Sequence, residues 1–517
     1  MKKESVVIAV ALLPFGASSS VAQNKVPKDN RPNIILFLVD DMGWQDTSLP
    51  FWTRSTDLNK RYHTPAMERL ASRGMMFTQA YASSISSPSR VSLLTGMNAA
   101  RHRVTNWTLE KDKPTDRHSD VLRFPEWNYN GICQVSGISH TYDVTSLSQL
   151  LKDSGYHTIH CGKAHWGAIN TPGENPHHFG FEVNIAGHAA GGLASYLGED
   201  NFGNRTDGKL SPLNAVPGLK DYWGKNVFVT EALTIEAKKA LDKAKVLGQP
   251  FFLYMAHYAV HVPFDKDMRF YDKYRKQGLS EHEAAYAALV EGMDKSLGDL
   301  LDWLDQNMMA DNTVVIFMSD NGGLSSESEW RDNPLHTQNH PLNSGKGSAY
   351  EGGVREPMIV KWPGHVRPAT RCSTYLLIED FFPTILDIAQ VKDRKTKQKI
   401  DGVSFMPRLM GKAPFNADLQ RSLVWNCPNL WGNDGPGIGP TCTIRKGNWK
   451  LIYYYDTGKK ELFDIPADIG EKKDLSLQNP SIVKRLSEEL SSYLRRVGAQ
   501  RPSFKAINKP CPWPDEV

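Results

Sequence analysis

The chain has 517 residues, of which 40% are hydrophobic and 23% charged, and its formal net charge is +4. This is the composition of an ordinary globular protein that is long enough for a large domain and a smaller one. So small an excess of positive charge does not indicate a nucleic-acid-binding protein, and any attraction for an anionic ligand must be local.

The first residues, MKKESVVIAVALLPFGASSSVAQ, have the pattern of a signal peptide. Two lysines precede an apolar run over residues 6–17, and Ser20-Val21-Ala22 fits a small-residue cleavage site. The run is shorter than the about 20 residues that a membrane-spanning helix needs. A buried N-terminal strand is the alternative. We predict a signal peptide over residues 1–22, a linker over 23–31, and an exported protein, periplasmic or secreted, without a membrane anchor.

Strand-like and helix-like segments then alternate. NIILFLVDDMGW (33–44) is an apolar run ending in two carboxylates, typical of a strand buried on both faces. TPAMERLASRGMMF (64–77) indicates a helix with Pro65 in its first turn and Gly74 as its stop. SSPSRVSLLTG (86–96) leads into another helical segment, and by itself Ser86 fits a helix cap.

The alternation continues in four more segments: SLSQLLKDSGYHTIHCGKAHWG (146–167), PFFLYMAHYAVHVPF (250–264), AAYAALVEGMDKSLGDLLDWLDQ (284–306) and TVVIFMSDNGG (313–323). This pattern predicts an α/β fold, in which a large central, mostly parallel mixed sheet is flanked by helices. Polar residues gather just after the predicted strands, at the edge where such sheets bind ligands.

The pattern changes after Gly411. TIRKGNWKLIYYYDTGKKELFDI (443–465) indicates paired antiparallel strands, and PSIVKRLSEELSSYLRRVG (480–498) indicates one helix. We therefore predict a catalytic domain over residues 32–412 and a C-terminal α+β subdomain over 413–517. The six cysteines show no C-x-x-C spacing, and Cys427 and Cys442 are the closest pair that an exported protein could bridge.

Two predicted strands end in oxygen-bearing side chains. Asp40 and Asp41 follow the first strand, and Asp320 and Asn321 follow a much later one. Either pair alone fits a cap or turn. Together they offer three carboxylates and an amide oxygen, which suit one hard divalent cation, calcium first and magnesium second. Three uncompensated carboxylates in a cleft would be costly, which also favours a metal.

Cationic side chains follow other predicted strands and glycines: Lys163, His165, His257, His261 and Lys346. Each by itself fits a solvated lysine or a bonded loop histidine. A metal with several cationic donors around a hydroxyl describes a site for a tetrahedral oxyanion, either sulfate or phosphate.

SSPSRVSLLTG resembles the signature C/S-x-P-S-R-x-x-L-L-T-G of the type I sulfatases, members of the alkaline phosphatase superfamily. Other stretches resemble blocks of that family in its order, from about Pro32 to about Lys412: VDDMGW, GYHTIHCGKAHWG, AHYAVHVP, SDNGG and GKGSAYEGGVREP. The C-terminal strands and helix resemble its small second domain. The resemblance implies an alkaline phosphatase-like fold and a sulfuric ester hydrolase. One departure is Asn343-Ser344, where many members have Arg-Gly, and it affects the expected substrate contacts.

The resemblance implies that Ser86 is converted to formylglycine by a separate maturase, as in bacterial serine-type sulfatases. The hydrated aldehyde is then the nucleophile that attacks sulfur. By the same resemblance Asp40, Asp41, Asp320 and Asn321 hold calcium together with residue 86. Arg90 and Lys163 bind the nucleophile and the sulfate, and His165 takes a proton as sulfate leaves. His261 protonates the departing alcohol with Lys346 beside it. His257 falls outside the matching position and is expected to be structural.

A sugar substrate needs polar partners for its hydroxyls and aromatic faces for its ring. Loop residues that could supply them, and that could equally be packing or solvated residues, are Trp107, His177, His178, Arg331 and His336. As a set they favour an exo-acting enzyme on a terminal sulfated hexose or hexosamine of mucin or glycosaminoglycan type.

Two alternatives stay open. A phosphatase or phosphodiesterase of the same superfamily would use unmodified Ser86, generally with two zinc ions. A catalytically silent, exported glycan-binding protein would result if Ser86 were not converted.

Overall fold

The computed structural model describes residues 1, 30–325, 339–412, 420–432 and 435–517. Apart from Met1, the predicted signal peptide lies outside the described residues, as does nearly all of the predicted linker. None of the helices in the described part of the chain has the length and hydrophobicity needed to cross a bilayer.

The centre of the structure is a nine-stranded sheet in the order β11-β2-β10-β9-β1-β8-β6-β7, with β12 also paired to β2. Its strands are β1 Asn33–Val39, β2 Met75–Tyr81, β6 His157–Gly162, β7 Val183–Ile185, β8 Phe251–Ala256, β9 Thr313–Ser319, β10 Arg355–Lys361, β11 Thr370–Cys372 and β12 Leu376–Leu377. Only β10 runs against its neighbours. Every residue of β1, β8 and β9 is buried, as their continuous apolar runs predict.

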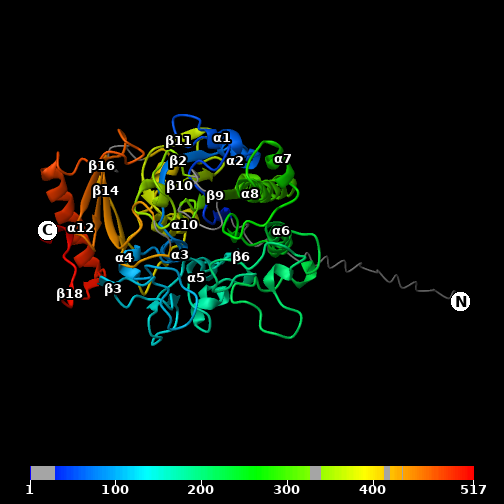
Figure 1. Ribbon diagram of the computed structural model, residues 1–517. Coiled ribbons are helices and arrows are strands. Elements are labelled where there is room, and N and C mark those ends of the chain that lie inside the picture. Colours follow the sequence, from blue (N-terminus) through cyan, green and yellow to red (C-terminus); the bar gives the residue numbers. More distant parts are fainter. Residues whose placement is uncertain (2–29, 326–338, 413–419, 433–434) are drawn as a thin grey trace. The chain divides into compact units, whose positions relative to one another are not determined.

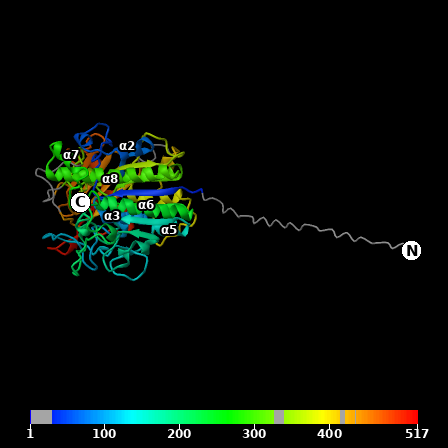
Figure 2. The ribbon, with the colours of Figure 1, turned by 90° about the vertical axis from the view of Figure 1, so that its right-hand side faces the viewer.

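Helices cover both faces of this sheet (Figures 1 and 2). On one face Ile35 and Phe37 pack in a core with α2 Pro65–Ser72, α6 Val229–Leu247 and α8 Glu281–Gln306. On the other face Leu36 and Leu38 pack in a core with α3 Ser86–Thr95, α5 Leu147–Asp153 and α10 Phe381–Ile388. Alternate residues of one strand therefore belong to opposite cores, which is the expected consequence of the strand's two-residue period.

Apart from the C-terminal sheet and the helix packed on it, the remaining helices and strands are short. The helices are α1 Asp57–Arg61, α4 Ala99–His102, α7 Tyr271–Lys276, α9 Glu351–Val354 and α11 Met406–Leu409, and the strands are β3 Leu122–Arg123, β4 Ile132–Cys133, β5 Tyr142–Asp143, β17 Ser503–Phe504 and β18 Lys509–Pro510.

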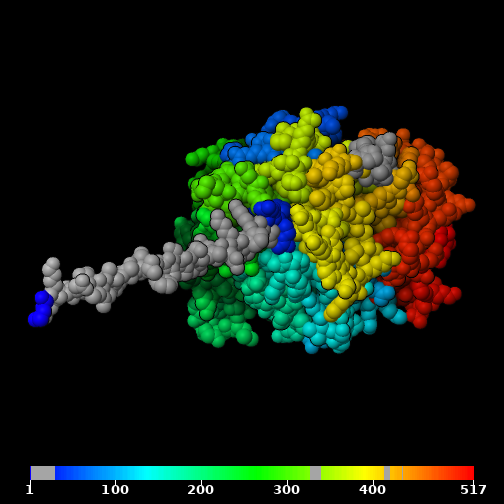
Figure 3. Space-filling model, turned by 180° about the vertical axis from the view of Figure 1, so that it is seen from behind, coloured from blue at the N-terminus to red at the C-terminus, as the bar shows by residue number. Residues whose placement is uncertain are grey.

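A second sheet lies in the C-terminal part (orange to red in Figures 1 and 3). Its four antiparallel strands are β13 Ser422–Cys427, β14 Thr441–Lys446, β15 Trp449–Tyr454 and β16 Lys460–Asp464. Helix α12 Pro480–Val497 packs on it through Leu486, Leu490 and Leu494, which recur every four residues. The predicted fold class is confirmed.

Residues 31–517 form one compact unit. Lys450 of β15 places its ammonium 3.1 Å from Glu351 of α9 and 3.0 Å from Glu471, and all three side chains are buried. The domain boundary near residue 412 stays a prediction. All six cysteines are free thiols, and Cys442 lies opposite Asn426 rather than Cys427 in the β13–β14 pairing.

Candidate active site

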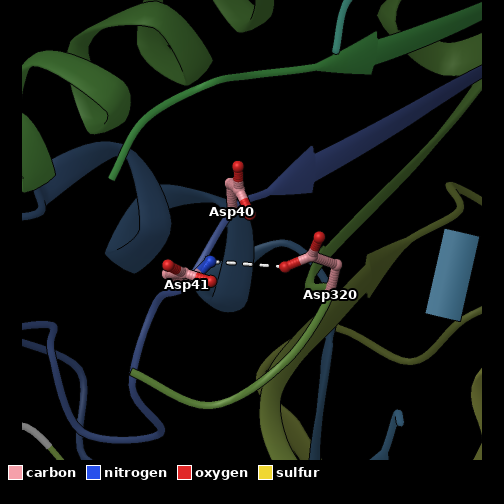
Figure 4. A group of neighbouring side chains, drawn as sticks. All are labelled: Asp40, Asp41 and Asp320. Atoms are coloured by element: carbon pink, nitrogen blue, oxygen red, sulfur yellow. Dashed lines mark hydrogen bonds between the residues drawn. The ribbon is translucent and has the colours of Figure 1, made fainter. Parts of the chain in front are cut away.

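The candidate site lies at the carboxyl ends of the central strands. Asp40 and Asp41 directly follow β1, and Asp320 directly follows β9, its neighbour in the sheet. Figure 4 shows Asp320 beside the two aspartates, with the Asp41 backbone N–H directed at its carboxylate. Lys163 follows β6 in the same way. The sheet therefore brings together side chains that are widely separated in sequence.

The three carboxylates form a buried cluster. One oxygen from each of Asp40, Asp41 and Asp320 lies within 4.8 Å of the other two. Burial raises the pKa of Asp40 to about 7; Lys163 opposes this shift, and the charges of Asp320 and Asp41 add to it. Burial acts on Asp41 too, but the charges of Lys346, His261 and Lys163 outweigh it and hold the pKa of Asp41 below its usual value.

Each carboxylate has a cationic partner. The ammonium of Lys163 lies 2.6 Å from Asp40, and that of Lys346 lies 2.7 Å from Asp41. Arg90 donates from Nε to Asp320 at 2.8 Å. The expectation that the carboxylates lack compensation without a metal is therefore wrong, because a cationic side chain lies beside each of them.

Ser86 is the first residue of α3, and its hydroxyl is directed into the carboxylate cluster. It lies 3.1 Å from Asp40 Oδ1 and 3.0 Å from Asn321 Oδ1, and it accepts a hydrogen bond of 3.1 Å from Lys163 Nζ. The helix cap is Ile85, which makes no side-chain cap bond. The helix-cap interpretation of Ser86 is therefore wrong.

The oxygen donors fit a hard divalent cation. Asn321 donates from Nδ2 to Asp41 at 2.7 Å, which leaves its Oδ1 on the side of Ser86. Three carboxylates, this amide oxygen and the oxygen of residue 86 thus converge. Calcium and magnesium prefer such all-oxygen ligand sets.

His165 is buried with one ring nitrogen bonded. Its Nε2 lies 3.0 Å from the carbonyl of Thr108, which can only accept, so Nε2 carries the hydrogen. Its Nδ1 has no hydrogen-bond partner among the described residues. Burial, followed by the charges of Lys163 and Arg90, holds the pKa of His165 well below its usual value. A neutral imidazole with a free nitrogen is equipped to accept a proton.

His261 is held with the opposite nitrogen toward the cluster. Its Nδ1 lies 2.7 Å from the carbonyl of Val262, and its Nε2 lies 3.7 Å from Asp41 Oδ2. Burial and the charge of Lys346 lower the pKa of His261 to about 3, so the free protein holds this ring neutral at pH 7.

A cavity of about 500 Å³ opens over this cluster. Its lining includes Asp41, Ser86, Lys163, His165, His261 and Lys346, and also the predicted substrate residue Trp107. His257 is not part of the lining; it is fully buried, with Nε2 2.9 Å from Ser296 Oγ, which agrees with the expected structural place.

Two other predicted substrate residues, His177 and His178, are not brought into the cavity. His177 and His178 are exposed on the 3₁₀ turn Pro176–Phe179, where their Nδ1 atoms bond the carbonyls of Phe181 and Pro172. Neither lines the cavity, so their role stays a prediction. Arg331 and His336 lie outside the described residues.

Residues on other loops also line the cavity and were not predicted from the sequence, above all Trp431, Leu213 and Asn214. Trp431 lies in CPNLWGNDGPG, a stretch rich in Gly, Asn and Pro. An aromatic residue in such a turn-rich loop is the sequence feature that could have marked Trp431 as a candidate substrate residue. Trp431 lies beyond the predicted boundary at residue 412, so the sequence assigned it to the C-terminal subdomain and not to the catalytic site.

Comparison with known proteins identifies the family. Residues 32–391 match the Sulfatase family model, and residues 345–499 match the model of the N-sulphoglucosamine sulphohydrolase C-terminal region. A sulfatase of Formosa agariphila is 29% identical, over 99% of this chain and 98% of that protein. The N-acetylgalactosamine-6-O-sulfatase of Bacteroides thetaiotaomicron is 28% identical, over 94% of this chain and 98% of that protein.

A solved structure is similar over nearly the whole chain. The crystal structure of Ps i-CgsB in complex with k-i-k-neocarrahexaose superposes with a TM-score of 0.70 at 27% identity, covering 90% of this chain and 93% of that one. The chain belongs to the sulfatase family.

Proposed function

We propose that this sulfatase removes sulfate from a sulfated glycan, as an exo-acting enzyme on a terminal sulfated hexose or hexosamine. The observation that carries the proposal is the position of Ser86 Oγ, which is within 3.1 Å of Asp40, Asn321 and Lys163 on the floor of the cavity. The names of two similar proteins, an N-acetylgalactosamine-6-O-sulfatase and a protein crystallised with k-i-k-neocarrahexaose, support a sugar substrate.

Ser86 is proposed to be the residue converted to formylglycine. A hydrated aldehyde there would supply one hydroxyl for attack on sulfur and a second for release of sulfate. Lys163, 3.1 Å from the side-chain oxygen, would stabilise a developing negative charge on it. The fixed start of α3 at Ser86 holds the reacting atom in place.

The proposed metal ligands are Asp40, Asp41, Asp320, Asn321 and residue 86. A calcium ion bound there would draw charge from a sulfate oxygen as a Lewis acid. The balance of charges favours an anionic substrate: three carboxylates are matched by Arg90, Lys163 and Lys346, so a divalent cation leaves the site with an excess of positive charge.

Two different groups are proposed to move protons. The free Nδ1 of His165 would accept a proton during release of sulfate, because its Nε2 is committed to Thr108. His261 and Lys346 would protonate the leaving alcohol. Since His261 is neutral in the free protein, the negative charge of the bound ester must raise its pKa, or Lys346 must supply the proton to it.

Export is part of the proposal, because the first 22 residues have the signal-peptide pattern. The proposal also requires a separate maturase that acts on Ser86. The decisive experiment uses protein purified from a host that has such a maturase. The peptide containing residue 86 should be lighter by two hydrogen atoms than the encoded peptide and should react with a hydrazide probe. The same preparation should release sulfate from sulfated sugars.

The outcomes separate the alternatives. Full sulfatase activity with an unmodified Ser86 would contradict the formylglycine proposal. Two zinc ions per chain with hydrolysis of phosphate esters would favour the phosphatase. An unmodified residue with glycan binding and no turnover would favour the silent binding protein.

A further inference from the structure

The cavity lining is divided by chemistry. Its ionisable side chains gather around Asp41 and Ser86, where the sulfate group would be bound. The remaining described lining residues are uncharged, among them Ile85, Trp107, Leu109, Leu213, Asn214 and Trp431. The part of the substrate beyond its sulfate therefore meets an apolar and aromatic surface with few polar side chains.

Trp431 is held in place from two sides. Gly347 (φ +85°) packs against its ring so closely that a Cβ at this glycine would lie 2.1 Å from Trp431 Cε3. The ammonium of Lys346 lies 5.8 Å from the ring centroid. The ring therefore packs against the same loop that positions Lys346 beside Asp41.

The backbone on either side of Trp431 is also fixed. The carbonyls of Leu430 and Gly432 accept hydrogen bonds of 3.0 and 3.1 Å from the backbone N–H and the guanidinium of Arg117. Arg117 belongs to the same loop region as Trp107. The indole is still only partly buried, so a preorganised aromatic face remains available to a ligand.

We propose that Trp431 is a specificity-determining residue, whose indole packs against the uncharged sugar ring that carries the sulfate. This inference rests on the proposed carbohydrate sulfatase function. A sugar ring has an apolar face of C–H groups, and aromatic rings with a few polar neighbours are a common surface for such ligands. Asn214 lines the same cavity and can bond a ring hydroxyl.

Because the lining away from the sulfate position is uncharged, the cavity disfavours a sulfated uronate as substrate. A ring carboxylate would lose water on entering the cavity and would need a cation to compensate. Lys163 and Lys346 are already paired with Asp40 and Asp41, and the described lining residues offer no further lysine or arginine. The described part of the lining therefore favours a neutral hexose or an N-acetylhexosamine as the substrate ring.

The test compares Trp431→Ala and Trp431→Phe with the parent, using the formylglycine-containing full chain. Trp449→Ala is the matched control, because Trp449 is a half-buried tryptophan on β15 of the C-terminal sheet and does not line the cavity. KM and kcat are measured on a 6-sulfated N-acetylhexosamine and on a sulfated hexuronate, and inorganic sulfate serves as an inhibitor that occupies only the sulfate position. Thermal unfolding checks that each variant is folded.

Trp431→Ala should raise KM for the sulfated hexosamine by about tenfold, and Trp431→Phe should retain most of the affinity. Inhibition by inorganic sulfate should change less than about twofold, because sulfate does not reach the indole. Trp449→Ala should resemble the parent. An unchanged KM for folded Trp431→Ala would overturn the role of Trp431, and equal kcat/KM of the parent on the hexuronate would overturn the neutral-ring assignment.

The role of Trp431 can be tested even if the protein proves to have no sulfatase activity. If the parent cleaves no sulfate ester, calorimetric binding of the same sulfated hexosamine still tests the inference. Trp431→Ala should weaken that affinity by the same factor, and equal affinities in parent and variant would overturn it.

Discussion

The hydroxyl of Tyr196 donates a hydrogen bond of 2.8 Å to the backbone carbonyl of His261, and the carbonyl of Tyr258 shares the same hydroxyl at 2.8 Å. Tyr196 is fully buried, and its ring stacks on Phe228 with centroids 4.9 Å apart. One side chain therefore fastens both ends of the turn that presents the His261 ring to Asp41. We infer that Tyr196 positions His261.

Tyr196→Phe should remove the hydrogen bonds to the carbonyls of Tyr258 and His261 and keep the packing of the ring on Phe228. Because protonation of the leaving group depends on the geometry of His261, kcat on sulfated sugars should fall by about tenfold or more. KM should change little, and activated aryl sulfates, whose alcohols leave without a proton, should be affected much less. Steady-state kinetics on both substrate types measures the split.

Tyr156→Phe is the matched control, since Tyr156 is also buried and its hydroxyl also donates to a backbone carbonyl, that of Pro32 at 2.9 Å, away from the His261 turn. Equal losses on sugar and aryl sulfates in Tyr196→Phe, or the same split in Tyr156→Phe, would mean that Tyr196 contributes only stability.

His261 and His165 should fail at different steps. Loss of the leaving-group proton in His261→Ala should reduce turnover of sugar sulfates by about 10²–10⁴-fold, with a smaller effect on aryl sulfates. His165→Ala should release about one equivalent of alcohol per enzyme and then stall, because the role proposed for its unbonded Nδ1 is confined to the release of sulfate. Rapid-quench measurement of alcohol and sulfate separates the two. Steady release of both products by His165→Ala would refute this division.

The metal proposal is tested best at Asp320, which bonds both the Asp41 backbone and Arg90. Asp320→Asn keeps the size of the side chain and removes its charge. It should lower calcium affinity by at least about tenfold, because a carboxylate ligand is lost. Calcium per chain, measured by elemental analysis after dialysis, should fall from one toward zero, and added calcium should no longer raise Tm. Undiminished calcium in Asp320→Asn would remove Asp320 from the ligand set.

The sequence predicts the parts of the site that follow directly from strand ends. Asp40 and Asp320 each come just after a mainly apolar strand, and Lys163 comes just after a shorter strand of mixed polarity. The parallel sheet places such strand ends side by side. The opposed nitrogens of His165 and His261 depend on bonds to carbonyls that no sequence pattern specifies.

The wall of the cavity was not predictable for a different reason. Thr105 bonds Asn429 across 324 residues of chain, so the mouth is formed by tertiary packing between two irregular segments. Closeness in sequence was misleading in the other direction: His177 and His178 follow Lys163 within a short stretch, yet local turn geometry directs their Nδ1 atoms to backbone carbonyls.

A buried carboxyl away from the catalytic cluster makes stability depend on pH. Glu379 is 4% exposed and accepts a hydrogen bond of 2.8 Å from Asn98 Nδ2. Burial, with the charge of Asp380, raises the pKa of Glu379 from 4.5 to about 8. Between these values the folded protein keeps the proton that the unfolded chain has released. The contribution to stability is therefore fully present below pH 4.5 and is lost as pH rises toward 8.

Glu379→Gln should remove this pH dependence and keep the acceptor for Asn98. As pH rises between the two pKa values, the parent loses stability and the variant does not. The difference between their free energies of unfolding should therefore grow by up to about 1.4 kcal/mol for each pH unit. Denaturant unfolding at several pH values between 5 and about 8.5 measures this difference, which should level off above the pKa of about 8 in the folded protein. Glu488→Gln, at an exposed position of α12, should follow the parent throughout. If the gap between Glu379→Gln and the parent stays constant across this range, Glu379 is ionised in the folded protein, and the Asn98 amide and Arg421 hold its charge despite the burial.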